Sequence, residues 1–140
     1  DLIWSIDPEN ETLENLVNKM RDHASNVFTP IDLPYRMKVT KVFEDMNLDP
    51  EVKSNLYSLY KEAINNITKH TRPEKILINL AIKNKTFHLY IENSKDHILA
   101  NKFSSKKGLS SMKVRAKSLG AELKIEDLPE KFIVDLKLAF

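Results

Sequence analysis

Three polar side chains with the spacing of one helical face carry the strongest chemical signal in this sequence: Glu62, Asn66 and Lys69. Each residue of a helix turns the chain by about 100°, so the three fall on one arc. The carboxylate and the amide lie about 6 Å apart. Mg²⁺ takes hard oxygen ligands such as an amide carbonyl, and lysine meets phosphate as a point charge. A carboxylate beside them can orient a water or accept a proton. The set suits a magnesium-bound phosphate.

A plainer interpretation of the same segment stays open. An apolar arc runs beside the polar one, formed by Leu56, Tyr60, Ala63 and Ile67. A solvated polar face next to such an arc is common in amphipathic helices. Asn65 flanks the polar arc and His70 lies between the two arcs. Spacing alone therefore does not separate a phosphate site from a solvated face.

The helix that would position these side chains has clear ends in the sequence. Asp49-Pro50-Glu51 predicts its start, with a capping Asp, Pro at the first helical position and an acid in the first turn. Arg72-Pro73 predicts its end near His70. An earlier amphipathic helix is predicted over residues 13–28, where apolar residues recur at helical spacing and Asn10 or Thr12 can cap the start.

Strand patterns follow the second helix. Apolar residues alternate over 76–82 and 87–91, with a turn at 83–85. The polar stretch 93–107 predicts a loop, and a helix is predicted over 108–119, ended by Gly120. Two more strands are predicted at 123–125 and 132–138, and a short one at 37–42. This order predicts a two-layer α+β sandwich.

Composition limits the function classes. The 140 residues include 22 basic and 20 acidic side chains, so no strong positive field is available to attract nucleic acid. The absence of cysteine excludes disulfides and thiolate chemistry. The four scattered histidines do not suggest a metal site. No apolar run reaches the roughly 20 residues of a membrane span. The chain begins at Asp1 without Met, which suggests a fragment of a longer protein.

Three separated motifs resemble those of one family. Residues 56–70 resemble the N box of sensor histidine kinases with a short nucleotide lid, a group that commonly serves response regulators of the NarL or LytTR type. Residues 3–10 resemble the junction between the dimerisation helices and the ATPase domain, and residues 20–24 match the segment after it. Residues 108–116 resemble the second glycine box and its helix. The resemblance covers essentially the whole chain.

The resemblance implies the Bergerat-type ATPase fold shared by gyrase, a heat-shock chaperone, histidine kinases and MutL, with a mixed β-sheet covered on one face by helices. Residues 1–8 would end the dimerisation helix, and 9–140 would form the ATPase domain. By the same resemblance, Asn66 ligates Mg²⁺, Glu62 assists phosphoryl transfer, and Lys69 faces the phosphates. Further nucleotide contacts are expected at His70, Glu92, Lys107, Gly108 and Leu109.

The implied reaction moves the γ-phosphoryl of ATP to a histidine of the dimerisation domain, so ATP and Mg²⁺ are the expected ligands. The implied partners are that dimerisation domain, a response regulator and a second copy of the full-length protein. The setting would be the cytoplasmic side of a membrane-anchored bacterial sensor, without direct membrane contact by this domain. The isolated chain is expected not to phosphorylate itself, because the phosphoacceptor segment is absent. His23 lies off the apolar stripe of its helix and lacks the motif of a phosphoacceptor.

The glycine boxes depart from the family pattern. The first box, Asp-x-Gly-x-Gly, matches residues 92–96, where Glu92 replaces the aspartate that accepts a hydrogen bond from adenine, and both glycines are missing. The second box keeps only Gly108, preceded by two lysines that can attract phosphate or be ordinary loop lysines. The third box is absent at 129–132. Two hypotheses follow: a working kinase domain with weakened nucleotide affinity, or a pseudokinase-like binding module that signals through partner contacts.

Overall fold

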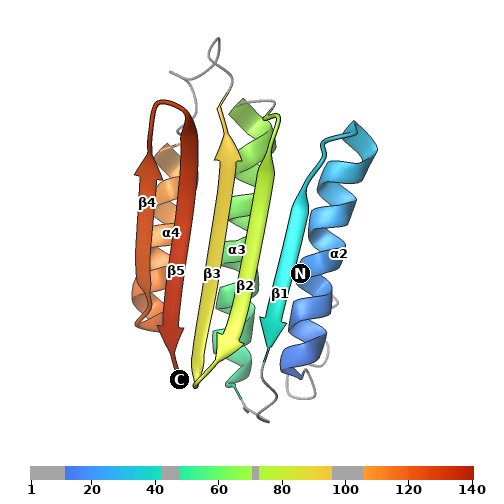
Figure 1. The fold of residues 1–140 in the computed structure, drawn as a ribbon. Coiled ribbons are helices and arrows are strands. Elements are labelled where there is room, and N and C mark those ends of the chain that lie inside the picture. Colours follow the sequence, from blue (N-terminus) through green and yellow to red (C-terminus); the bar gives the residue numbers. More distant parts are fainter. Residues whose placement is uncertain (1–11, 42–47, 71–72, 96–105) are drawn as a thin grey trace.

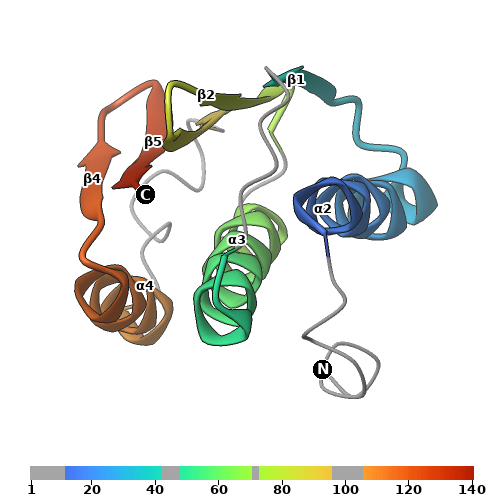
Figure 2. The same ribbon diagram turned by 90° about the horizontal axis from the view of Figure 1, so that it is seen from below.

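The computed structural model describes residues 12–41, 48–70, 73–95 and 106–140. Within these ranges the chain forms one five-stranded sheet with three helices packed against a single face, as Figure 2 shows end-on. The strand order is β1-β2-β3-β5-β4 (Figure 1). The predicted two-layer α+β sandwich with a mixed sheet is confirmed.

The helices begin and end close to the predicted residues. α2 spans Leu13–Phe28 and is capped by Thr12, whose hydroxyl accepts from the Asn15 backbone N–H at 3.1 Å. A short 3₁₀ turn, η2, covers Thr29–Ile31. α3 spans Pro50–His70, as its capping signal predicts. α4 spans Lys106–Leu119 and thus starts two residues before the predicted Gly108.

The sheet combines one parallel and three antiparallel pairs. β1 (Arg36–Lys41) runs parallel to β2 (Ile76–Lys83). β2 forms a hairpin with β3 (Thr86–Ser94), which pairs with β5 (Lys131–Ala139), and β5 pairs with β4 (Glu122–Asp127). The predicted turn at 83–85 is confirmed: Asn84 and Lys85 adopt positive φ angles of 53° and 57°, the geometry that suits a tight two-residue hairpin.

The core lies between the helices and one face of the sheet. Every second residue of the central strands points toward the helices and is buried, including Ile78, Leu80, Phe87, Leu89, Val134 and Leu136. The helices contribute their apolar stripes, including Leu16, Met20, Tyr60, Ile64 and Met112. The alternate strand residues form the outer face of the sheet, which carries no described helix (Figure 2).

Some predictions fall outside the described residues or need correction. The predicted junction at residues 1–8 lies outside them. The predicted loop 93–107 is wrong at both ends, because Asn93 and Ser94 continue β3 and Lys106 and Lys107 begin α4. The two lysines are therefore not loop residues. Among the described residues, none of the helices combines the length and apolar content that crossing a membrane requires.

Candidate functional site

The polar ends of three elements meet at one end of the sandwich. Figure 1 shows the C-terminal end of α3, the end of β3 and the start of α4 together at the same edge of the molecule. These are the segments in which the sequence places its candidate phosphate and nucleotide side chains. Chain topology therefore brings together residues that are more than 40 positions apart.

Asn66 occupies an unusual position near the end of α3. Its residue is only 1% exposed, and both polar atoms of its carboxamide are buried without a hydrogen-bond partner among the described residues. An unsatisfied buried amide costs about 1–3 kcal/mol, so native proteins seldom keep one without a purpose. A carboxamide oxygen is a suitable Mg²⁺ ligand. The chemistry of this side chain thus fits the metal role that the sequence predicts for it.

Glu62 and Lys69 lie one turn to either side of Asn66. Glu62 is half-buried and Lys69 is exposed. No ion pair or hydrogen bond within the described residues occupies either side chain, so both charges stay available for a ligand. α3 ends at His70, as predicted, but the side chain of His70 lies outside the described part of the chain.

α3 is joined to both neighbouring helices by polar contacts. On one side, His23 Nε2 of α2 lies 3.1 Å from Asn65 Oδ1, and the Tyr60 hydroxyl donates to the Met20 carbonyl oxygen at 2.7 Å. On the other side, the Arg115 guanidinium of α4 donates to Asn55 Oδ1 at 3.2 Å. These contacts fix how α3 is rotated and thus where Asn66 points.

The first turn of α4 contains Lys107, Gly108 and Leu109. The first four N–H groups of a helix have no intrahelical partner and favour an anion at that end. Leu109 is partly buried and packs against the core, which anchors the turn. The side chain of Lys107 lies outside the described residues. The predicted nucleotide contacts in this segment stay a prediction.

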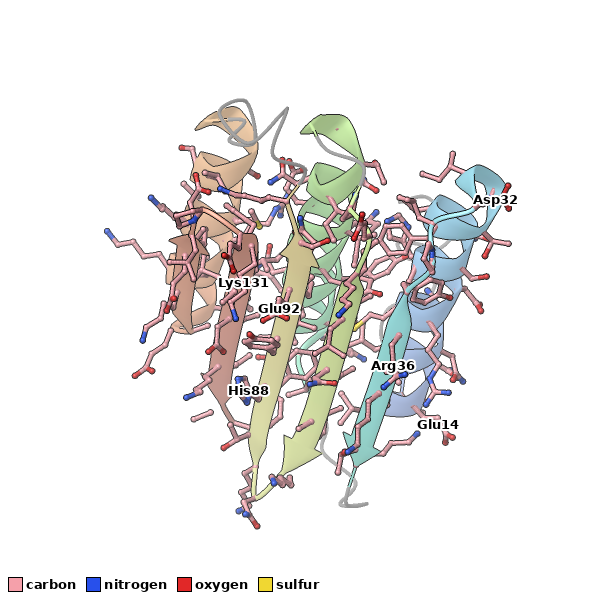
Figure 3. The ribbon with its side chains drawn as sticks, turned by 45° about the horizontal axis from the view of Figure 1, so that its top comes forward. Glu14, Asp32, Arg36, His88, Glu92 and Lys131 are labelled. Carbon is pink, nitrogen blue, oxygen red and sulfur yellow. The ribbon has the colours of Figure 1, made fainter. Side chains whose placement is uncertain are left out.

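Glu92 does not join this group. In β3 the buried residues Phe87, Leu89 and Ile91 point toward the helices, and Glu92 has the opposite phase. Its carboxylate lies on the outer face, where Oε1 accepts from the Tyr90 hydroxyl at 2.7 Å and from Lys131 Nζ at 3.2 Å. Figure 3 shows Glu92 and Lys131 side by side there. The structure therefore does not bring Glu92 together with Asn66.

These contacts shift two acid–base equilibria on the outer face. The Tyr90 hydrogen bond, opposed by partial burial and reinforced by Lys131, lowers the pKa of Glu92. Burial together with the nearby Glu92 carboxylate raises the pKa of Tyr90 to about 12. Glu92 is thus a charged member of a surface network. It would have to leave that network to meet a nucleotide on the other face.

Asn93 is the polar residue of β3 that does face the helices. It is 1% exposed, and its Nδ2 donates to the Ser94 carbonyl oxygen at 3.0 Å. The alternation of Phe87, Leu89 and Ile91 is enough to predict that residue 93 faces the helices, since it lies two positions after Ile91 in the same strand. The resemblance to the first glycine box points instead to Glu92, which has the opposite phase in β3.

His23 and His88 have structural partners. His88 is partly exposed and pairs with Asp135 Oδ1 at 2.6 Å on the outer face. His23 packs edge-on against Tyr57 and Tyr60 in addition to its contact with Asn65. Within the described ranges, no cluster of three or more His, Cys, Asp or Glu side chains forms a metal site. A bound Mg²⁺ would therefore depend on Asn66 together with phosphate and water oxygens.

Comparison with known proteins places these observations in a family context. No family profile matches the chain. The chain is 30% identical over 92 residues to the sensor histidine kinase LiaS of Bacillus subtilis, covering 65% of this chain and 24% of LiaS. It is equally similar to the sensor protein VraS of Staphylococcus aureus over 95 residues, covering 67% of this chain and 27% of VraS. The chain thus spans about a quarter of the length of these curated relatives.

Solved structures with the same fold are histidine kinase domains. The nucleotide-free catalytic domain of ThkA has a TM-score of 0.64 at 13% identity, covering 92% of this chain and 94% of that domain. The mycobacterial sensor histidine kinase MprB has a TM-score of 0.61 at 15% identity, covering 92% and 95%. Neither comparison favours a separate binding-module function. The sequence relatives of this chain are therefore sensor histidine kinases, and its fold is that of the solved histidine kinase domains of ThkA and MprB.

Proposed function

We propose that this chain is the ATP-binding catalytic domain of a two-component sensor histidine kinase. It would transfer the γ-phosphoryl group of ATP to a histidine on a dimerisation domain. The observation that carries the proposal is the buried carboxamide of Asn66, which has no hydrogen-bond partner within the described residues. It lies at the end of the sandwich where α3, β3 and α4 meet. Its placement next to half-buried Glu62 and exposed Lys69 supports a magnesium–phosphate site.

Each residue has a role that its chemistry supports. Asn66 would offer Oδ1 to Mg²⁺, which when bound neutralises phosphate charge. Lys69 and Lys107 would add positive charge near the phosphates, and the free N–H groups of Gly108 and Leu109 in the first turn of α4 would donate to them. Glu62 would orient or accept the proton of the attacking histidine. His70 is retained as a further nucleotide contact.

The adenine contact is assigned to Asn93 in place of Glu92. A carboxamide offers one donor and one acceptor side by side, and such a pair matches an adenine edge. Asn93 faces the helices, whereas Glu92 is held on the outer face by Tyr90 and Lys131. Because Asn66 is shielded from solvent, a metal–nucleotide complex would reach it only when neighbouring groups move aside. This requirement, together with the missing glycines, supports weak nucleotide affinity.

The remaining parts of the proposal concern the whole protein. Residues 1–8 would connect the domain to a dimerisation helix, and the full-length protein would act as a homodimer on a response regulator of the NarL or LytTR type. The relatives LiaS and VraS are sensor proteins, which supports a cytoplasmic domain of a membrane-anchored sensor.

Phosphotransfer to a supplied dimerisation domain tests the function. The chain is incubated with radiolabelled ATP, Mg²⁺ and the dimerisation segment of its own full-length protein. Acid-labile label on the added segment, and none on this chain alone, is the expected result. Asn66→Ala should remove the label, while Asn79→Ala, an asparagine on the outer face, should keep it. An unlabelled dimerisation segment with the wild-type chain would argue for a module without kinase activity.

A further inference from the structure

A hollow of about 450 Å³ opens on the outer face of the sheet, opposite the helices. Its size lies within the roughly 300–1,000 Å³ typical of small-molecule sites. It lies where β1 and β2 begin and β3 ends. In the sheet register Arg36, Leu77 and Glu92 form one row across these three strands. Leu77 thus lies between a cation and a carboxylate in this row. Figure 3 shows Arg36 on β1 and Glu92 on β3.

The two cations of the hollow have no acidic partner among the described residues. Arg36 and Glu92 are two strands apart, about 10 Å between their backbones, which is too far for a direct pair. Lys75, the residue before β2, makes its described hydrogen bonds through its backbone: its N–H donates to Ser94 Oγ at 3.0 Å, and its carbonyl oxygen accepts from the Ser94 N–H at 2.9 Å. Arg36 and Lys75 both line the hollow, and no ion pair within the described residues neutralises either charge.

The acids of the hollow do not cancel this positive charge. Glu92 is compensated by Lys131, which lies 3.2 Å from its Oε1. Only the exposed carboxylate of Glu74 then opposes Arg36 and Lys75. Both described hydrogen bonds of Glu92 end on Oε1, which leaves Oε2 to accept from a ligand. The hollow is positive at one side and offers an acceptor at the other.

We infer that this hollow binds a small organic anion with an apolar body and a hydrogen-bond donor at its far end. The carboxylate or phosphate of the ligand would meet Arg36 and Lys75. Its body would rest on Leu77 and against Pro34 and Tyr35, which also line the hollow. The donor would reach Glu92. Because Arg36 presents a planar fork of N–H groups, it suits a two-oxygen anion better than a single oxygen.

The site is separate from the proposed nucleotide site. Glu92 and Asn93 are consecutive residues of β3 and point to opposite faces of the sheet. The inference therefore does not depend on nucleotide binding, and it can fail or hold whatever the outcome of the phosphotransfer assay. A ligand in the hollow would contact β3 at Glu92, and the next residue of that strand, Asn93, faces the helices.

Titration with 4-hydroxyphenylacetate, followed by ¹⁵N–¹H correlation spectra of the 140-residue chain, tests the inference. This probe carries a carboxylate, a ring and a phenol donor. Saturable shifts are expected at the amides of Arg36, Leu77 and Glu92, with a dissociation constant on the order of 1 mM. The uncharged isostere 4-hydroxyphenethyl alcohol should bind at least about tenfold more weakly, because it lacks the anion.

Matched variants test whether the positive charges of Arg36 and Lys75 are required to bind the probe. Arg36→Gln and Lys75→Gln should each weaken binding of the probe, Arg36→Gln by about tenfold. Lys38→Gln should leave it unchanged, because Lys38 lies on the same face of β1 but one row away, beside Asn79. All three side chains are exposed, so the variants should fold normally. Shifts that do not saturate, or equal affinity in Arg36→Gln and Lys38→Gln, would overturn the inference.

Discussion

His23 Nε2 in α2 lies 3.1 Å from Oδ1 of Asn65 in α3, and the next residue of α3 is Asn66, whose carboxamide is buried. The contact joins two residues that are 42 positions apart in the sequence, one from each helix. It occurs one turn from the hydrogen bond between the Tyr60 hydroxyl and the Met20 carbonyl. α2 therefore controls the rotation of the helix that carries the proposed metal ligand.

The contact between His23 and Asn65 should be measurable as a coupling energy. His23→Ala should lower the free energy of unfolding by about 1–2 kcal/mol, because it removes one hydrogen bond and the edge contacts with Tyr57 and Tyr60. A double-mutant cycle with Asn65→Ala, followed by urea unfolding, should give a coupling of about 0.5–1.5 kcal/mol. Strictly additive effects would mean that the two side chains do not interact in solution.

Acidification should destabilise the protein through His23. Burial lowers the pKa of this imidazole below its ordinary 6.5, against the opposing effect of the Asn65 hydrogen bond, and Lys61 lowers it further. Below pH 6.5 the unfolded chain therefore takes up a proton that the folded chain resists. The stabilisation is complete above that pH and is lost as the pH falls from 6.5 toward the lower folded pKa.

Urea unfolding at pH 7.5 and pH 5 measures this loss (roughly either side of the ordinary histidine pKa). His23→Gln keeps a donor for Asn65 but does not titrate in this range, so it should lose less stability than the wild type on acidification. The other histidines are present in both proteins and cancel in the comparison. An equal loss in the two proteins would remove His23 from the explanation.

Asn93, not Glu92, should determine adenine binding. Asn93→Ala should weaken ADP binding by about tenfold or more, because it removes the polar group of β3 that faces the helices. Glu92→Gln should change it little, since Glu92 is bonded to Tyr90 and Lys131 on the other face. Asn93→Asp keeps a hydrogen-bond acceptor, so its affinity for ADP should lie between that of the wild type and that of Asn93→Ala. Calorimetry with ADP checks all three, and a strong effect of Glu92→Gln alone would restore the assignment made from the motif.

Most of the fold could be predicted from local patterns. The Asp49-Pro50-Glu51 start of α3, the alternation in the strands and the Gly120 stop of α4 are each decided by a few neighbouring residues. Gly120 takes φ 69°, and the N–H of Ala121 donates to the Ala116 carbonyl at 2.9 Å, which is the expected helix end. Sheet order and the parallel β1–β2 pair depend on long-range packing and were left open by these patterns.

The candidate site could be predicted only in part, for a definable reason. The face of α3 follows from helical periodicity, so Glu62, Asn66 and Lys69 could be grouped from sequence. Burial of the Asn66 amide could not be predicted from the sequence, because it depends on the segments that pack against α3. The motif points to Glu92 because that residue is acidic. In a strand, however, alternate side chains reach opposite faces, and Asn93 is the residue that lies on the face toward the helices. The contact between His23 and Asn65 needs two helices in place before it can exist.

Removing the Asn66 carboxamide should stabilise the ligand-free protein. Asn66→Leu keeps the number and branching of the side-chain heavy atoms, in a somewhat larger volume, and has no polar atom to desolvate, so the free energy of unfolding should rise by about 1–3 kcal/mol. Urea unfolding without nucleotide measures it. Asn79→Leu, at a partly exposed position on the outer face, is the control and should give no comparable gain. A residue kept at a cost to stability is expected where it serves binding.

Calorimetric titration of the 140-residue chain with millimolar Mg²⁺–ATP tests directly whether α3 carries a magnesium–nucleotide site. We expect saturable binding with a dissociation constant on the order of 0.1–1 mM, which corresponds to roughly −5 to −4 kcal/mol. Binding should be lost in Asn66→Leu, even though that variant is more stable, and kept in Asn79→Ala. Absence of binding by the wild-type chain, or unchanged binding by Asn66→Leu, would contradict the assignment of a magnesium–nucleotide site to α3.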